Sequence, residues 1–244
     1  MKKIYFLKLI IDIGNTRTKI ALFAEKDILS LSIINELSLI SIQEFVRNNE
    51  ISSTIISSVK EINSEILAVA DYYNAIILTE NIAIPIKNYY KTSDTLGNDR
   101  LAAVVGGYSL YPNKDIIIID AGTCLTMDHI TQKGEYIGGR ISPGIEMRYK
   151  ALNTFTDKLP LVQKEKSVPM IGRDTKSSVI SGVQRGILAE VDLIISDLRL
   201  QKVDIIALIT GGDHFFFEKE LKNSIFAHPN LVLIGLNEIL DFNE

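Results

Sequence analysis

Apolar residues along the chain fall into short runs that end at glycine-containing turns. Leu7–Asp12 is a nearly continuous apolar run, and Lys19–Ala24 is a second one after a short polar turn. Ile116–Asp120 followed by Cys124–Ile130 repeats this arrangement, with a further strand expected around Glu135–Gly138. Two apolar runs on either side of such a turn predict a β-hairpin. The sequence therefore predicts two copies of the same strand-turn-strand motif.

Between and after the hairpins, the spacing of apolar residues indicates alternating helices and strands. The expected helices are Ile42–Asn49, Glu61–Asn74, Asp99–Leu110, Gly144–Leu152 and Thr175–Leu200. The other expected strands are Thr54–Ser58, Ala75–Thr79, Asp204–Thr210 and Leu231–Gly235, the last of them followed by a short C-terminal helix. This alternation is typical of α/β layers, which bind ligands at the carboxyl ends of their strands.

The repeated hairpin predicts two similarly folded lobes, because a solenoid would need three or more short repeats. Pro112 and Asn113 interrupt the apolar pattern near Tyr111–Lys114. We therefore expect an N-terminal lobe over residues 1–113 and a C-terminal lobe over residues 114–244.

Composition narrows the range of functions. With 46% hydrophobic and 23% charged residues, the chain has the composition of an ordinary globular protein. Its net charge of −4 and scattered basic residues disfavour a nucleic-acid partner. No apolar run approaches the roughly 20 residues that cross a bilayer, so no membrane span is expected. Lys2 and Lys3 precede an apolar stretch that Lys8 and Asp12 interrupt, which favours a cytoplasmic protein over a secreted one.

Cysteine and histidine give no sign of a metal centre. The single cysteine, Cys124, excludes an internal disulfide and a multi-cysteine metal site, and we expect it to be a small packed residue. His129, His214 and His228 show no ligand spacing, so we expect surface or packing roles for them.

The first turn combines a carboxylate, a glycine, hydroxyl groups and two cations. In order it reads Asp12, Ile13, Gly14, Asn15, Thr16, Arg17, Thr18 and Lys19. Glycine permits close approach of backbone N–H groups to a phosphate, and a carboxylate at the end of a strand can orient Mg²⁺ through water. Taken alone, the turn is better explained as an ordinary hairpin turn, because Asp, Gly and Asn favour turns for backbone reasons.

A second turn of the same kind, Asp120–Thr123, strengthens the phosphate interpretation, because two facing hairpins could hold a triphosphate from both sides. A third turn, Thr210–Asp213, could pack closely against an adenine ring. We expect the adjoining Phe215–Phe217 to lie in the core, with part of the run available to wall the base pocket.

Gly97–Arg100 precedes an apolar helix, which places Asp99 and Arg100 in its first turn. An N-terminal cap explains an aspartate there without any function. Arg100 is harder to explain in that way, because a cation near a helix N-terminus is electrostatically disfavoured.

In combination, the motifs resemble those of type III pantothenate kinases. They occur in that family's order: Asp12–Lys19, Gly97–Arg100, Asp120–Thr123, Gly138–Gly144 and Thr210–Asp213. The phosphate hairpins and the Thr-Gly-Gly-Asp turn are similar to those of the wider acetate and sugar kinase/Hsp70/actin superfamily. The other two motifs, Gly97–Arg100 and Gly138–Gly144, are more specific to type III pantothenate kinases. By itself, Gly138–Gly144 is expected to be a glycine-rich loop that ends with Pro143 before a helix. The resemblance implies an α/β fold of two ribonuclease-H-like (actin-like ATPase) lobes with a nucleotide cleft between them.

The resemblance also implies an activity, the ATP-dependent phosphorylation of pantothenate to 4′-phosphopantothenate, the first step of coenzyme A biosynthesis. It implies that Asp99 is the base that takes the proton from the substrate hydroxyl. The substrate-binding residues that it implies are Tyr90, Gly97, Asn98, Asp99, Arg100 and Thr175. From its geometry, we expect the Arg100 guanidinium to pair with the carboxylate of pantothenate.

For the nucleotide, the resemblance implies that Asp12–Lys19 is the first ATP-binding loop and that Thr123 contacts a phosphate. Asp120 would bind a monovalent cation, K⁺ or NH₄⁺, and Asp12 would hold Mg²⁺, partly through water. A homodimer is implied as well.

Four alternatives stay open in the sequence. Tyr89 adjoins Tyr90 and could take its place at the substrate, and Thr175 could be a helix N-cap as well as a substrate contact. The same ATP cradle could also serve a kinase for another small hydroxylated metabolite. A nucleotide-binding regulator without catalysis is the fourth alternative.

Overall fold

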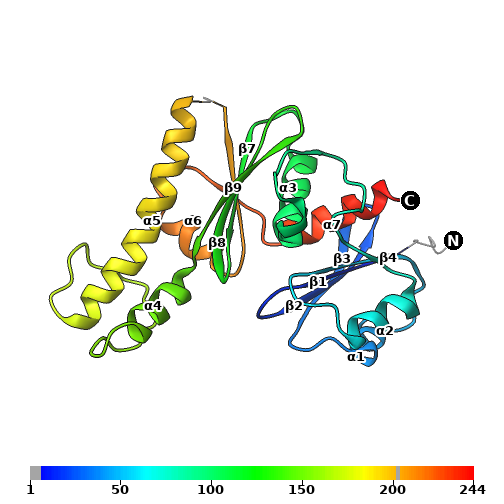
Figure 1. Ribbon diagram of the computed structural model, residues 1–244, viewed down its shortest axis with the longest axis horizontal. Coiled ribbons are helices and arrows are strands. Elements are labelled where there is room, and N and C mark those ends of the chain that lie inside the picture. The colour runs from blue at the N-terminus through cyan, green and yellow to red at the C-terminus, as the bar shows by residue number, and fades with distance from the viewer. Residues whose placement is uncertain (1–6, 202–203) are drawn as a thin grey trace. The chain divides into compact units, whose positions relative to one another are not determined.

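The computed structural model describes residues 7–201 and 204–244, and the chain divides into two compact units (Figure 1). The first unit comprises the chain up to Asn113, together with Lys133–Ile137 and Asn230–Glu244. The second comprises Lys114–Gln132 and Gly138–Pro229. The division after Asn113 falls where the apolar pattern is interrupted, while the C-terminal segment belongs to the first unit. Lys2 and Lys3 lie outside the described residues.

The first unit is an α/β structure built on a sheet with the strand order β3-β2-β1-β4-β5. Its strands are β1 (Leu7–Ile13), β2 (Thr18–Ala24), β3 (Asp27–Ile34), β4 (Ile51–Ser58), β5 (Ile76–Ile77) and β6 (Lys87–Asn88). Its helices are α1 (Leu39–Val46), α2 (Ser64–Tyr73), the 3₁₀ turn η1 (Ser93–Thr95), α3 (Asn98–Leu110) and α7 (Leu231–Phe242). The expected hairpin is present, since β1 runs antiparallel to β2 and parallel to β4.

Strand β1 is buried along its whole length, so both of its faces are covered. On one face, Leu9 and Ile11 belong to an apolar cluster with Ile42 of α1 and Val69 of α2. On the other face, the Lys8 ammonium group pairs with a carboxylate of α7. Alternate side chains of a strand point to opposite faces, so this pattern defines a sheet between two helical layers.

Helix α7 corrects one prediction, since Leu231–Gly235 is its first part and not a strand. A short continuous apolar run fits a buried helix as well as a buried strand, and here the run packs against α3. Glycine makes this crossing possible. A Cβ on Gly235 would lie 1.7 Å from the carbonyl oxygen of Ala102, and a Cβ on Gly106 would lie 2.4 Å from that of Leu231.

The second unit has a sheet with the order β11-β10-β7-β8-β9, while the first residues of β9, Glu135 and Tyr136, belong to the first unit and pair there with β6. Its strands are β7 (Ile116–Ala121), β8 (Cys124–Ile130), β9 (Glu135–Pro143), β10 (Ile206–Thr210) and β11 (Phe226–Ala227). Its helices are α4 (Ile145–Thr154), α5 (Thr175–Gln201) and α6 (His214–Glu220). The expected glycine-rich loop from Gly138 to Pro143 is therefore wrong, since β9 extends through Pro143.

The two sheets repeat one topology. The central strand of each, β1 or β7, is antiparallel to the next strand along the chain and parallel to β4 or β10. Strand order in the two sheets corresponds throughout, β3-β2-β1-β4-β5 against β9-β8-β7-β10-β11. The internal repeat predicted from the two hairpins is confirmed.

Helix α5 supplies much of the core of the second unit. Its Val183 and Ile187 belong to an apolar cluster with Ile117 and Ile119 of β7. Phe217 joins this cluster at 1% exposure, but Phe215 is 64% exposed, so the prediction of a core position is wrong for Phe215. Within the described ranges, no helix is long and apolar enough to cross a membrane.

The α3–α7 crossing generates a stability prediction. Replacing Gly235 with alanine should lower the free energy of unfolding by about 3 kcal/mol, because the added methyl group overlaps the α3 backbone. Urea unfolding followed by circular dichroism measures this change. Gly186→Ala on α5 is the matched control, since a Cβ there has no neighbour within 4 Å. We expect the control to be neutral or to stabilise by up to about 1 kcal/mol. Equal unfolding of Gly235→Ala and wild type would contradict the close crossing.

Candidate active site

The β1–β2 turn presents polar groups at the end of a buried strand. Asp12 is 9% exposed, whereas Asn15, Thr16 and Arg17 are exposed. The turn is closed by a hydrogen bond from the Gly14 N–H to the Arg17 carbonyl oxygen at 3.0 Å. The predicted residues of this loop therefore lie together, and its tip is exposed.

Strand register adds a residue that the sequence did not indicate. Ser57 of β4 lies opposite Asp12 and is fully buried. Within the described part of the chain, its hydroxyl oxygen makes no hydrogen bond. A buried polar group of this kind needs a partner such as water or a ligand. Only the parallel pairing of β1 with β4 reveals the position, because Ser57 lies outside every turn motif.

The β7–β8 turn places Asp120 and Thr123 at the corresponding end of the second sheet. Its backbone is closed by a hydrogen bond from the Gly122 N–H to the Cys124 carbonyl oxygen at 3.0 Å. Gly144 lies directly against it, since a Cβ there would meet the carbonyl oxygens of Gly122 and Thr123 at 2.4 and 2.5 Å. The last glycine of the Gly138–Gly144 motif therefore supports the turn through close backbone packing.

The Thr210–Asp213 turn packs against the same loop. Gly211 has a φ of +90°, and a Cβ there would lie 2.5 Å from the Ala121 carbonyl group and from Asp120 Oδ1. The Asp213 N–H donates to the Ala121 carbonyl oxygen at 2.9 Å. A Cβ on Gly212 would have no neighbouring atom of the described residues within 4 Å. The structure thus brings the second and third sequence motifs together within the second unit.

Helix α3 begins with the third group of predicted residues. Gly97 is its N-cap, and the Asp99 carboxylate accepts a hydrogen bond from the Arg100 N–H at 2.8 Å. Asp99 therefore lies inside the first turn and is not the N-cap that the sequence allowed. The Asn98 side chain donates to the Leu78 carbonyl oxygen at 2.9 Å, which ties the start of α3 to the end of the first sheet.

Arg100 is 7% exposed, although its guanidinium group is charged. Its Cζ lies 5.4 Å from the centre of the Tyr90 ring, and its Nη1 lies 3.5 Å from the Tyr90 hydroxyl oxygen. Tyr90 stacks in turn on Tyr136, with ring centres 5.9 Å apart and planes 10° apart. Tyr89 is 58% exposed, so Tyr90 is the tyrosine that joins the predicted Arg100 site.

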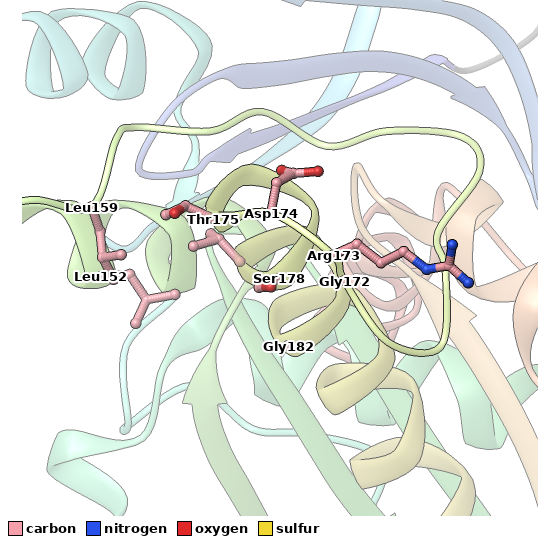
Figure 2. Close-up of a pocket in the computed structure, with 9 residues that line it drawn as sticks. Leu152, Leu159, Gly172, Arg173, Asp174, Thr175, Ser178 and Gly182 are labelled. Carbon is pink, nitrogen blue, oxygen red and sulfur yellow. The ribbon is translucent and has the colours of Figure 1, made fainter.

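Thr175 lines a cavity of about 590 Å³ at the start of α5 (Figure 2). Leu152 and Leu159 lie together on one part of its wall, and the Arg173 side chain extends away from them. Asp174 caps the helix, because its Oδ1 accepts a hydrogen bond from the Ser177 N–H at 2.9 Å. Thr175 is therefore the first helical residue, and the alternative that it is the N-cap is wrong.

Comparison with known proteins identifies the family. The sequence profile for the type III pantothenate kinase matches residues 8–197. The chain belongs to the type III pantothenate kinase family. It is 42% identical to a type III pantothenate kinase of Phocaeicola vulgatus, over 98% of this chain and 99% of that protein. It is 40% identical to one of Bacteroides fragilis, over 97% and 98% of the two chains.

Solved structures show the same fold at lower identity. A Baf family protein from Campylobacter jejuni matches with a TM-score of 0.65 and 24% identity, over 96% of this chain and 98% of that chain. A glucokinase from an Antarctic psychrotroph matches with a TM-score of 0.55 and 12% identity, over 98% and 99%. The predicted fold class, two ribonuclease-H-like lobes of the actin-like ATPase type, is confirmed for this type III pantothenate kinase family member.

The cap of α5 generates a pH-dependent prediction. Hydrogen bonds from the backbone and the side chain of Ser177 lower the pKa of Asp174 below its ordinary value. A lowered folded-state pKa stabilises the fold above the unfolded-state pKa of about 4, and the contribution is lost as the pH falls through the folded-state value.

Asp174→Ala should therefore lower the melting temperature at pH 7, and the difference from wild type should shrink as the pH falls below about 4. Thermal unfolding followed by circular dichroism across this range tests the expectation. Asp157→Ala, which removes an exposed aspartate from the segment before α5, is the control. Equal melting temperatures of Asp174→Ala and wild type at pH 7 would contradict a stabilising cap.

Proposed function

We propose that the protein transfers the γ-phosphoryl group of ATP to the hydroxyl group of pantothenate, giving 4′-phosphopantothenate. This reaction is the first step of coenzyme A biosynthesis. The observation that carries the proposal is the 40% to 42% identity to type III pantothenate kinases over nearly the whole chain. The structure adds that Tyr90 and Arg100 are in contact beside Asp99 within one unit.

Phosphoryl transfer requires mainly that a hydroxyl group be aligned with the γ-phosphorus and that the charge on the transferring group be neutralised. In our proposal, Asp99 orients the pantothenate hydroxyl group and accepts its proton. Arg100 pairs with the pantothenate carboxylate, as the planar guanidinium fork favours. Gly97, Asn98, Tyr90 and Thr175 make the remaining substrate contacts.

For ATP, we propose binding by the Asp12–Lys19 loop and a phosphate contact by Thr123. The exposed position of Asn15, Thr16 and Arg17 supports this role. Both turns offer carboxylate and carbonyl oxygens, the donors that hard cations prefer. Asp12 would hold Mg²⁺, partly through water, and Asp120 would hold K⁺ or NH₄⁺. Bound Mg²⁺ would supply neutralisation of phosphate charge.

We also propose a cytoplasmic homodimer. The segment between α4 and α5, which leads into Thr175, carries the exposed apolar residues Phe155, Leu161, Met170 and Ile171. Exposed apolar surface of this kind favours association with another protein surface.

Two other functions remain as alternatives to be tested. The first is a kinase for another small hydroxylated metabolite. A glucokinase with the same fold is the observation that suggests this alternative. The second is a nucleotide-binding regulator that lacks catalysis. The presence of Asp99 and Asp120 disfavours this alternative. A panel of hydroxylated acids and sugars separates the first from pantothenate phosphorylation, and an absence of turnover with every substrate would favour the second.

The proposed reaction predicts pantothenate-dependent formation of ADP by the purified protein with Mg²⁺. Turnover in K⁺ should exceed turnover in Na⁺ alone, because Asp120 is proposed to bind the larger cation. An enzyme-coupled ADP assay measures both effects. ATP binding without pantothenate-dependent turnover would contradict the substrate, whereas equal rates in K⁺ and Na⁺ would contradict only the cation assignment.

If Asp99 is the base, Asp99→Asn should lower kcat by about 10²- to 10⁴-fold, because the amide cannot accept the hydroxyl proton. ATP affinity, measured by calorimetry, should stay near that of wild type. Asp94→Asn removes an exposed carboxylate from η1, five positions earlier, and serves as the control. Near-normal kcat in Asp99→Asn would remove Asp99 from the role of base.

A further inference from the structure

Tyr136 is a fully buried aromatic residue that the proposed mechanism does not use. It lies on β9 and stacks on Tyr90, with ring centres 5.9 Å apart and planes within 10° of parallel. Stacked aromatic pairs at this separation stabilise one relative orientation of the two rings. The orientation of the Tyr90 ring therefore depends on Tyr136.

The backbone around Tyr90 is held by the same part of β9. The Tyr89 N–H donates to the Tyr136 carbonyl oxygen at 2.9 Å, and the Lys87 N–H donates to the Gly134 carbonyl oxygen at 2.8 Å. The Tyr90 N–H is bonded to Asn88 Oδ1 at 2.9 Å. Because β6 comprises only Lys87–Asn88, these bonds and the ring stack contribute strongly to fixing this short segment.

Tyr90 in turn contacts the buried guanidinium group of Arg100, whose Cζ lies 5.4 Å from the ring centre. Arg100 lies in the first turn of α3, where the helix dipole disfavours a cation. The electron-rich face of an aromatic ring attracts such a cation, and the attraction strengthens when water is excluded. A change in the Tyr90 ring would therefore be transmitted to Arg100.

We propose that Tyr136 is a positioning residue for substrate recognition, acting through Tyr90 on Arg100. The proposal rests on the substrate-binding roles given to Tyr90 and Arg100 under the proposed function. Tyr136 itself need not touch pantothenate. Its ring holds Tyr90 in the orientation that leaves the Arg100 guanidinium group ready to pair with a carboxylate.

The test compares Tyr136→Leu, which removes the stacked ring, with Tyr136→Phe, which keeps it. Steady-state kinetics should show that Tyr136→Leu raises the KM for pantothenate about tenfold, while the KM for ATP stays within about twofold of wild type. In Tyr136→Phe, the KM values for both substrates should stay within about twofold of wild type, because the stacked ring is kept.

Phe23→Leu is the control for loss of a buried ring elsewhere in the first unit, since Phe23 of β2 is fully buried and lies outside the proposed site. Thermal unfolding shows whether the two leucine variants are destabilised to a similar extent. The proposal expects a raised KM for pantothenate in Tyr136→Leu alone. An equal rise in Phe23→Leu, or no rise in Tyr136→Leu, would overturn it.

A double-mutant cycle tests the route through Tyr90. In a Tyr90→Leu background, adding Tyr136→Leu should raise the KM for pantothenate less than about twofold, because the contact that transmits the effect is already gone. A full tenfold rise in that background would overturn the proposed route. Wild-type protein that fails to turn over pantothenate would defeat the proposed function and this inference together, whereas normal wild-type turnover with an unchanged Tyr136→Leu defeats the inference alone.

Discussion

The burial of one central strand in each sheet, β1 in the first unit and β7 in the second, is the constraint on which the rest of the structure depends. Strands covered on both faces carry mainly apolar side chains, and a buried charge on them needs a partner, as Lys8 of β1 has in a carboxylate of α7. Exposed polar groups are then found at the strand ends. Asp12 and Asp120 occupy those ends, and the turns that follow them carry the other proposed nucleotide contacts. The position of the site therefore follows from the burial of the strands.

Close backbone contact is a second constraint, and it gives several glycines a common physical meaning. Gly106 and Gly235 let α3 and α7 cross with their backbones in contact, while Gly144 and Gly211 let two further segments pack on the Asp120–Thr123 turn. A side chain at any of these positions would overlap backbone atoms that have no room to move. Glycines in these motifs thus act as packing elements, and other backbone segments lie directly against the Asp120–Thr123 turn.

The sequence predicted the hairpins and the repeat because these depend on local patterns, whereas the site residues come mainly from the family resemblance and stay predictions. The strands β1, β2, β7 and β8 follow from apolar runs on either side of a turn. The interpretation of Leu231–Gly235 failed because a short apolar run has no period that separates a buried helix from a strand, and only its packing against α3 decides. Ser57 and Tyr136 could not be found for a related reason. Their importance comes from strand pairing with β1 and with β6, which links positions far apart in the sequence.

Arg100 shows why such long-range pairing matters to the chemistry. A guanidinium group that is nearly excluded from water, in the first turn of a helix, lacks both hydration and a favourable helix dipole. The Tyr90 ring, whose centre lies 5.4 Å from the Arg100 Cζ, is one group that stabilises this cation. Tyr90 belongs to a segment with little regular structure of its own, so its orientation must come from β9. In our proposal, recognition of a carboxylate by Arg100 therefore depends on Tyr136, a residue 36 positions further along the chain.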